Sequence, residues 1–578
     1  MKLVLGGRCA VVLCSLAVSA GNLVACSSTS SEGADGAALA GQSGSSVGGR
    51  SESGGSAAAV GGNPSGAAGF GSGGAFSSGG AAGGGGEATS VAGGAGVAGS
   101  AADGGSAGFG GAPLGTAGAA NNPPPVLSGT KVDATVKVNR ATPMGKLGAG
   151  FAGFSFEKSH LSDAFFTPTH SALIAMFKLL GPSVVRIGAD DVNNSVWTPS
   201  ATFVKPGTTS PQVGSAEVDA LAGFLTATGW KAIYAVNMRG NSTPQTAVTE
   251  LQYVVPKLGA SLVGVEVGNE LNLYNMANVQ TVWHSYAQAI HSAFPSTAVA
   301  GPGAFLDINF ATKFINGEAS QINLVTHHYY RGTAGTSVAT LENLVSPDPN
   351  VVSESQAMAT AVRTNNIRDG YRWGELNTYS SHGQAGVSDG LVSALWGINF
   401  MLTTAQYGSA GVNFHGGGQN MDGNTCPNGA ASCDRPFRYS PLLEVDSKVT
   451  AAAPLFYGML LVSQIGTGDM LPTTVSAGST KLRGYAITTS DGTRVVLVNS
   501  EASTGVNATL DLGMAVASAS AVYLRGPSLT AATGTTLGEA PVTPAGTWAP
   551  QAPFTLTRDG SMVSVPVPAA SAVLISVR

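Results

Sequence analysis

The feature that most constrains the fold is a regular alternation of short apolar segments with longer segments of helical period, from about residue 147 to 418. In the longer segments, such as 216–228, 279–294 and 389–407, apolar residues recur every three or four positions. Repeated βα units of this kind predict an α/β fold, and eight of them predict a closed (β/α)8 barrel. The predicted strands are 150–157, 184–188, 232–238, 263–270, 298–303, 322–330, 371–377 and 411–415.

Polar side chains gather at the ends of these predicted strands. A barrel of this type places its active site at the carboxyl ends of the strands, so functional groups should occupy the last positions of each segment. Glu266 comes earlier in its strand and is interpreted as structural, paired inside the barrel, with Arg186 as a candidate partner. The polar residues at strand ends are Glu157, Arg186, Asn237, Asn269, Glu270, residues 327–330, Glu375, Asn377, Asn413 and His415.

The C-terminal part of the chain has a different pattern, with short alternating strands separated by Gly, Pro and Ser turns. This pattern predicts an antiparallel β-sandwich over residues 463–578, after a barrel that spans 146–462. Residues 126–145 precede the barrel and contain a segment that alternates through Val132, Ala134, Val136 and Val138. We expect this segment to add a strand to the same sandwich.

The N-terminal 26 residues resemble the signal peptide of a bacterial lipoprotein. Lys2 and Arg8 precede an apolar stretch, which ends in Leu-Val-Ala followed by Cys26. The stretch is shorter than the about 20 apolar residues that a membrane-spanning helix needs. We therefore expect export, lipidation of Cys26 and anchoring at the outer membrane or cell surface, with a plain cleaved signal as the alternative.

Residues 27–125 are dominated by Gly, Ala and Ser, a composition that cannot bury enough apolar surface to fold and that predicts a flexible tether. In the folded part, Cys426 and Cys433 are expected to form a disulfide, because an exported compartment permits one and no further ligands accompany them for zinc. The net charge of −5 and the lack of basic clusters argue against nucleic acid as a partner. No cofactor, metal or obligate protein partner is predicted.

Two carboxylates at strand ends carry the functional hypothesis. Glu270 ends the fourth predicted strand and Glu375 lies near the end of the seventh, and these strands face each other across a barrel mouth. A retaining glycosidase needs two carboxyl groups about 5–5.5 Å apart, one as acid and one as nucleophile. We expect Arg186 and a tyrosine at the end of the sixth strand to keep Glu375 ionised, while Glu270 keeps its proton and Asn269 contacts the sugar 2-hydroxyl.

Six motifs make the chain resemble glycoside hydrolase family 79, which contains β-glucuronidases and heparanase-type enzymes. The likeness covers about residues 130 to 578 and implies the barrel and sandwich described above, together with a retaining β-glycosidase activity on glucuronides. The motifs are Gly-Phe-Ser-Phe-Glu (153–157), Val-Glu-Val-Gly-Asn-Glu-Leu-Asn (265–272), His-His-Tyr-Tyr (327–330), Trp-Gly-Glu-Leu-Asn (373–377), Gly-Val-Ser-Asp (386–389) and Val-Asn-Phe-His-Gly-Gly (412–417).

The resemblance implies that Glu270 is the acid/base, Glu375 the nucleophile and Tyr329 the residue that orients the nucleophile. Strand periodicity puts His327 and Tyr329 on one face and His328 and Tyr330 on the other, and we predict that the first pair faces the site. Predicted sugar contacts are Glu157, Arg186, Asn269, His327, Tyr330, Asn377 and His415. Asn237, Asn413 and His415 also fit a purely structural role at strand ends.

One stretch departs from the family pattern. Members of the family bind the glucuronate carboxylate with a tyrosine and a glycine-rich backbone after the nucleophile. Here that stretch is Tyr379, Ser380, Ser381, His382 and Gly383, with one glycine and an inserted histidine. A β-glucuronidase is the predicted function. The alternatives are a β-xylosidase or β-glucosidase of the same fold and a surface lipoprotein that binds glycans without cleaving them.

Overall fold

The computed structural model describes residues 122–203, 210–416, 438–445 and 447–578. The predicted signal peptide, Cys26, the tether up to residue 121, and both Cys426 and Cys433 lie outside the described residues, so these assignments stay predictions. Within the described ranges, no helix combines the length and the apolar character that crossing a membrane requires.

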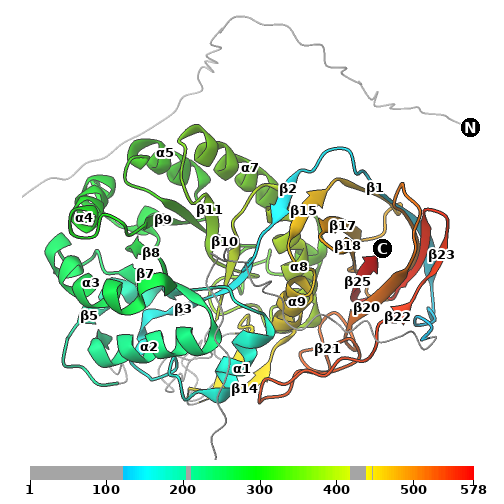
Figure 1. Ribbon diagram of the computed structural model, residues 1–578, viewed down its shortest axis with the longest axis horizontal. Helices are drawn as coiled ribbons and strands as arrows, with labels where there is room; N and C mark the ends of the chain where they lie inside the picture. The colour runs from blue at the N-terminus through cyan, green and yellow to red at the C-terminus, as the bar shows by residue number, and fades with distance from the viewer. Residues whose placement is uncertain (1–121, 204–209, 417–437, 446) are drawn as a thin grey trace, which may run out of the picture. The chain divides into compact units, whose positions relative to one another are not determined.

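Eight parallel strands of the described chain close into a barrel, which confirms the predicted fold (Figure 1). Each strand pairs with the next along the chain, and the last pairs with the first through Val412–Ala152 and His415–Ser155. The barrel strands are β3 Ala152–Glu157, β4 Val184–Gly188, β7 Lys231–Val236, β8 Leu262–Val267, β9 Val299–Phe305, β10 Leu324–Tyr330, β11 Tyr371–Asn377 and β12 Val412–His415.

Helices connect the barrel strands, and α2, α4 and α8 confirm the three helical segments expected from periodicity. The α-helices are α1 Ser171–Leu179, α2 Ser215–Thr228, α3 Pro244–Leu258, α4 Val279–Ala293, α5 Ile308–Glu318, α6 Leu341–Val345, α7 Pro349–Thr364, α8 Leu391–Gln406 and α9 Pro454–Ser463. Shorter elements are the 3-10 helices η1 Lys158–Leu161, η2 Asp190–Asn194, η3 Gly259–Ser261 and η4 Leu271–Leu273, and the strand pairs β5 Val196–Trp197 with β6 Gln212–Val213 and β13 Leu442–Val445 with β14 Lys448–Ala452.

The burial pattern of each helix follows from its neighbours. Helix α4 buries Val279, Trp283, Tyr286 and Ile290, an i, i+4, i+7, i+11 stripe that packs on the barrel while the other face meets water. Helix α8 is buried on nearly all sides, because it packs against α9 and also contacts the sandwich strand β18. A helix that is apolar all round needs such neighbours on every side.

The sandwich consists of two sheets in the described chain, and its first sheet takes β1 from before the barrel, as predicted (Figure 1). Strand β1 runs parallel to β19, whereas the other pairings within the two sandwich sheets are antiparallel. The first sheet has the order β16 Thr473–Ser476, β1 Lys131–Val138, β19 Gly505–Asp511, β24 Met562–Val567 and β23 Thr557–Asp559. The second has the order β2 Gly145–Leu147, β15 Gly468–Leu471, β17 Leu482–Thr489, β18 Gly492–Asn499, β25 Ser571–Val577, β20 Ala519–Arg525 and β21 Thr536–Leu537, with β22 Phe554–Thr555 beside β20.

The second sheet is buried on both faces. In β18, Val495 and Leu497 face the sandwich core, whereas Val496 and Val498 belong to the core shared with the barrel. A strand alternates its side chains between two faces, so an unbroken apolar run is what a sheet with two apolar neighbours requires. One face of this sheet therefore belongs to the barrel core, and the other face forms the separate core of the sandwich.

Leu574 tests this shared core. The side chain lies on the barrel-facing side of β25 and is 2% exposed. We expect Leu574→Ala to lower the free energy of unfolding by about 2–5 kcal/mol, because it removes buried methyl groups and leaves a cavity. Urea unfolding measures this change. Val445→Ala is the control, since Val445 is 56% exposed and its truncation should change stability by less than about 0.5 kcal/mol.

Candidate active site

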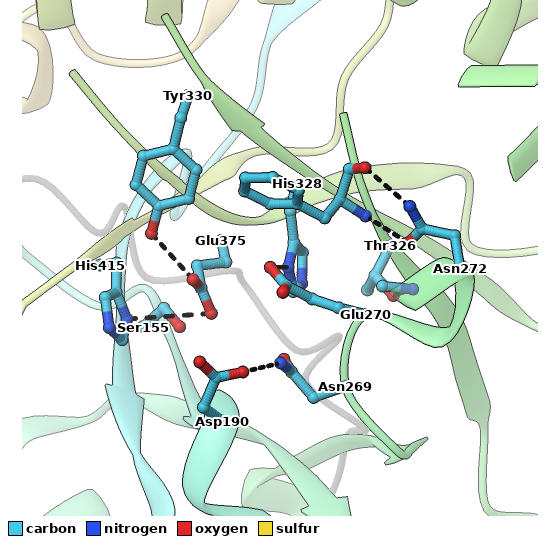
Figure 2. A network of polar contacts seen from close by, with 12 residues as sticks. Ser155, Asp190, Asn269, Glu270, Asn272, Thr326, His328, Tyr330, Glu375 and His415 are labelled. Atoms are coloured by element: carbon cyan, nitrogen blue, oxygen red, sulfur yellow. Dashed lines mark hydrogen bonds and ion pairs between the residues drawn. The ribbon is translucent and has the colours of Figure 1, made fainter. Parts of the chain in front are cut away.

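Glu270 lies in a tight turn directly after strand β8. The turn starts at Gly268, whose φ is +76°, and an added Cβ there would lie 2.7 Å from Leu271 Cδ2 and 2.9 Å from the hydroxyl oxygen of Tyr274. Glycine is therefore needed for both the backbone conformation and the space. Glu270 also has positive φ, at 54°, and Figure 2 shows its carboxyl group directed toward Glu375.

Glu375 lies on β11 at the opposite side of the barrel mouth and is held from several sides. The Tyr330 hydroxyl donates a hydrogen bond of 2.8 Å to Oε1, and an Arg186 N–H donates one of 2.9 Å to Oε2. His415 Nδ1 is 3.9 Å from Oε2 (Figure 2). The carboxylate side chain is only 8% exposed, so these partners replace the solvation that burial removes.

The buried guanidinium of Arg186 connects four barrel strands or their ends. Besides Glu375, it donates to Glu266 Oε2 at 2.6 Å, to Ser155 Oγ at 3.1 Å and to Asn269 Oδ1 at 2.7 Å. The predicted pairing of Arg186 with Glu266 is thus confirmed, and the predicted contact with Glu375 is present as well. One planar cation fixes the positions of all four groups.

The carboxyl groups of Glu270 and Glu375 are close enough to act on one bond. One oxygen from each and one nitrogen of His328 all lie within 4.8 Å of one another. A cation could bridge such a triplet. However, His328 Nδ1 is 3.0 Å from Glu270 Oε1, the spacing of a hydrogen bond in which one proton is shared. This contact allows a proton to be held between the imidazole and the carboxyl group of Glu270.

Burial and neighbouring charges separate the pKa values of the two carboxyl groups. Burial raises the pKa of Glu270 well above its ordinary range, and the charges of Glu375 and Asp190 raise it further. Burial also acts to raise the pKa of Glu375, but His415, Arg186 and the Tyr330 hydroxyl outweigh it and lower that pKa. Near neutral pH, Glu270 therefore holds a proton while Glu375 is ionised, as predicted.

Further polar groups surround the pair. Asn269 donates from Nδ2 to Asp190 Oδ1 at 3.0 Å, and Glu157 lies 3.6 Å from His415 Nε2 (Figure 2 shows the first contact). Burial and the nearby Asp191 raise the pKa of Glu157 to about 7. Burial lowers the pKa of His415, but Glu375 and Glu157 outweigh this and bring it to about 8. The predicted contacts Glu157, Asn269 and His415 thus share the mouth with the carboxyl pair.

The prediction that His327 and Tyr329 face the site is wrong. The Tyr329 hydroxyl donates to Asp348 at 2.7 Å, just before α7, and His327 Nε2 lies 3.2 Å from Glu354 on α7. These side chains pack on the outside of the barrel. The other pair, His328 and Tyr330, points to the carboxyl groups of Glu270 and Glu375 (Figure 2).

The alternation along β10 itself holds, and the prediction assigned the wrong one of its two faces to the site. A β-bulge lies on the neighbouring strand β11. The register pairs His327 with Trp373 but His328 with Glu375, so Gly374 is an extra residue on β11. Trp373 packs against Tyr329 on the outside of the barrel. Glu375 is two residues further along β11 and would face the same way in a regular strand, but the bulge turns it inward. A bulge re-aims the side chains that follow it, and a count of alternate residues cannot show one.

One other predicted sugar contact, Asn377, has a structural role instead, and so do the strand-end amides of Asn413 and Asn237. Asn377 donates from Nδ2 to the carbonyl oxygens of His415 and Tyr439 and is fully buried. Asn413 donates to the carbonyls of Phe154 and Val184, which accords with the alternative role expected for it. Asn237 likewise donates to the Ser195 carbonyl. These amides stabilise loops and strand ends, since buried polar groups need such partners.

In the loop 379–383, which was expected to bind the sugar carboxylate, the Tyr379 side chain does not point to the carboxyl pair. The Tyr379 hydroxyl donates to the Thr340 carbonyl at 2.8 Å, and Ser380 is bonded to Gly332 and Thr333. Tyr379 and Ser380 are therefore not the sugar contacts that were predicted. The loops after β10 and β11 pair through Thr333 and Ser380, and this pairing directs both side chains toward the loop after β10. Residues Ser381, His382 and Gly383 all have positive φ, and the His382 carbonyl accepts from the Arg438 amide.

Four residues that lie at the site were not predicted from the sequence as site residues. His328 was visible in the His-His-Tyr-Tyr motif and was assigned to the wrong face. Asp190 and Asp191 follow strand β4 at its carboxyl end, which is a signal that could have identified them. Tyr439 lies against His415 and Tyr330 with ring centroids 5.9 and 6.1 Å away. It comes after the last barrel strand β12 in the sequence, so no strand-end rule could find it.

The fold is similar to that of known glycoside hydrolases. No protein-family model and no curated protein sequence matches this chain. Among solved structures, the 4-O-α-L-rhamnosyl-β-D-glucuronidase from Fusarium oxysporum 12S, in complex with Rha-GlcA, has a TM-score of 0.61 at 19% identity and covers 76% of this chain and 100% of its own. The GH51 arabinofuranosidase of Xanthomonas axonopodis pv. citri has a TM-score of 0.55 at 17% identity, with coverage of 78% and 100%. The α-L-arabinofuranosidase of Thermotoga maritima has a TM-score of 0.55 at 13% identity, with coverage of 77% and 99%. At these identities the likeness concerns the fold.

Tyr330 and Tyr329 provide a matched pair of variants. Tyr330→Phe removes a hydrogen bond that stabilises ionised Glu375, so the pKa of Glu375 should rise by about one pH unit or more. A ¹³C-carboxyl NMR titration measures it, with the Glu375 signal assigned by its loss in Glu375→Gln. Tyr329→Phe should leave that pKa unchanged, because its hydroxyl contacts Asp348. A larger effect from Tyr329→Phe would contradict the assigned face.

Proposed function

We propose that this protein is a retaining glycoside hydrolase in which Glu375 is the nucleophile and Glu270 the acid/base. The observation that carries the proposal is the pair of carboxyl groups with oxygens within 4.8 Å and with pKa values moved in opposite directions. Inverting enzymes keep their carboxyl groups about 6.5–9.5 Å apart to admit a water, and retaining enzymes keep them at about 5–5.5 Å. The short separation supports attack by Glu375 itself.

The geometry supports a two-step reaction. Ionised Glu375 attacks the anomeric carbon while Glu270 gives its proton to the glycosidic oxygen, so the C–O bond to the leaving group breaks and a glycosyl ester forms. The ester carries no charge, which removes one of the groups that raise the pKa of Glu270. Glu270 then accepts a proton from water, the water oxygen bonds to the anomeric carbon, and the ester bond to Glu375 breaks.

For the substrate we propose a β-glucuronide. The motifs around both catalytic residues support this class. The similarity to the Fusarium enzyme, whose name states a β-D-glucuronidase activity, extends to the fold. A non-catalytic glycan-binding role is disfavoured, because binding alone gives no reason to hold one carboxyl protonated beside an ionised one.

A neutral sugar is the second candidate, and one observation favours it. Outside the catalytic pair, Glu157, Asp190 and Asp191 bring further carboxyl groups to the mouth, while the guanidinium of Arg186 is already bonded to Glu266 and Glu375. Carboxylates accept hydrogen bonds from sugar hydroxyls and repel a uronate. The Tyr379 hydroxyl, expected to bind a uronate, bonds to Thr340 instead.

Substitution of each catalytic glutamate gives distinct expected losses. Glu375→Gln should reduce kcat/KM by more than about 10³-fold on every substrate, because no ester can form. Glu270→Gln should reduce turnover by about 10²–10⁴-fold for alkyl glycosides, which need a proton on the leaving oxygen, and should remove the fall of kcat/KM at alkaline pH. The ¹H NMR spectrum of the first product should show the anomer of the substrate.

The control for these variants is Glu318→Gln. Glu318 is buried on α5 and contacts Gln280 and His284, so it tests the loss of a buried carboxylate away from the site. Its kcat/KM should stay within about threefold of the parent protein. An inverted first product, or full activity of Glu375→Gln, would refute the proposed mechanism.

A panel of aryl β-glycosides separates the two substrate classes. Glucuronide, xyloside and glucoside are compared by kcat/KM with one common leaving group. The glucuronide should be preferred by at least about 10-fold, since a recognised carboxylate is worth more than about 1.4 kcal/mol. Release of xylose or glucose alone would instead assign the neutral class, and no release from any β-glycoside would refute the enzymatic function.

A further inference from the structure

Two buried polar atoms near the acid/base have no hydrogen-bond partner within the described part of the chain. They are Nε2 of His328 and Oε1 of Glu266. Both side chains are fully buried, with an exposed fraction of 0%. An unpaired buried polar atom is costly, so such a pair in one place calls for an explanation.

The two atoms border the same small space, which exists because residue 303 is glycine. A Cβ built on Gly303 would lie 3.3 Å from His328 Nε2 and 3.4 Å from Glu266 Oε1. Gly303 is the extra residue of a β-bulge, since β10 pairs Thr326 with Pro302 but His327 with Ala304. Its φ of +57° also suits glycine. The imidazole nitrogen and the carboxylate oxygen therefore both lie next to this space.

The charge of each partner follows from its contacts. Glu266 is ion-paired with Arg186 at 2.6 Å and can only accept hydrogen bonds. Burial lowers the pKa of His328 to about 3, so the imidazole is neutral and has one N–H and one bare nitrogen. The N–H is most stable where it faces the carboxylate of Glu266. This puts the proton on Nε2 and leaves Nδ1 as the acceptor.

The bare Nδ1 faces Glu270 at 3.0 Å, and it can accept only if Glu270 supplies the proton (Figure 2). We propose that Glu266 is a positioning residue that fixes the tautomer of His328, and that His328 thereby keeps the proton of the acid on Glu270. Glu266 acts from inside the barrel and touches neither the substrate nor the leaving group. Its effect on catalysis passes through the imidazole.

The same arrangement helps the second step. Once Glu270 has given up its proton, its carboxylate lies beside the lone pair of Nδ1, a contact that disfavours the ionised form. Glu270 therefore regains a proton from the attacking water more readily. The reverse tautomer would donate to the Glu270 carboxylate and lower its pKa, so that less of Glu270 would hold the proton near neutral pH and its carboxylate would be a weaker base.

Histidine ¹⁵N NMR tests the tautomer without any need for activity. The His328 signals are assigned by their loss in His328→Phe. In the parent protein we expect the proton on Nε2 and a bare Nδ1. In Glu266→Gln the amide can donate to Nε2, so the proton should move to Nδ1 in a large part of the population. A proton on Nδ1 in the parent protein, or no change in Glu266→Gln, would overturn the proposal.

The kinetic test rests on the proposed function and uses an alkyl glycoside, whose leaving group needs the acid. Glu266→Gln should move the alkaline limb of kcat/KM to lower pH by about one unit, because Glu270 loses its proton more easily. The charged and titratable groups around Glu270 and His328 are Glu375, Asp190, Arg186, His415, Glu266 and His327. Loss of the Glu266 charge could also act directly through space, so a double-mutant cycle is needed.

In the His328→Phe background, Glu266→Gln should cause no further shift of the alkaline limb. An equal shift in both backgrounds would show direct action of the charge and would overturn the role of His328. His327→Phe is the matched control, because the neighbouring imidazole lies on the outer face against Glu354, and it should leave the limb unchanged. If no glycoside is cleaved, the proposed function fails while the ¹⁵N result still decides the tautomer.

Discussion

The buried guanidinium of Arg186 is the interaction on which the site depends. It holds the carboxylate of Glu375 on β11, the interior carboxylate of Glu266 on β8 and the amide of Asn269 in the turn after β8 at once. Removal of one partner from a buried ion pair typically costs about 3–5 kcal/mol, since a charge is left uncompensated. The geometry of the carboxyl pair is therefore coupled to the closure of the barrel.

The same cation makes the protonation states of Glu270 and Glu375 different. Arg186 contacts Glu375 directly and favours its ionised form, whereas Glu270 lies beyond it, beside the imidazole of His328. Burial acts on both carboxyl groups in the same direction, so the difference comes from which partners each one meets. Two chemically identical side chains thereby receive opposite protonation states within 4.8 Å.

Glycine makes this arrangement possible at three positions. Gly268 allows the turn that aims Glu270, Gly374 forms the bulge before Glu375, and Gly303 forms the bulge beside His328. At Gly268 an added methyl group would collide with the turn itself. The irregular points of a regular barrel thus coincide with the residues that carry the chemistry, as is common for bulges near active sites.

The sequence by itself determined the barrel and the strand from before it, and it selected Glu270 and Glu375 as candidate site residues, because periodicity and strand-end position are local properties. It also identified Arg186, whose place at a strand end fits both of its partners. The tertiary structure alone decided which face of β10 meets the carboxyl pair, and it placed Tyr330 and His328 there instead of Tyr329 and His327. The physical reason is that alternation along a strand defines two faces, and only the packing of β10 between the barrel interior and α7 decides which face meets the carboxyl pair.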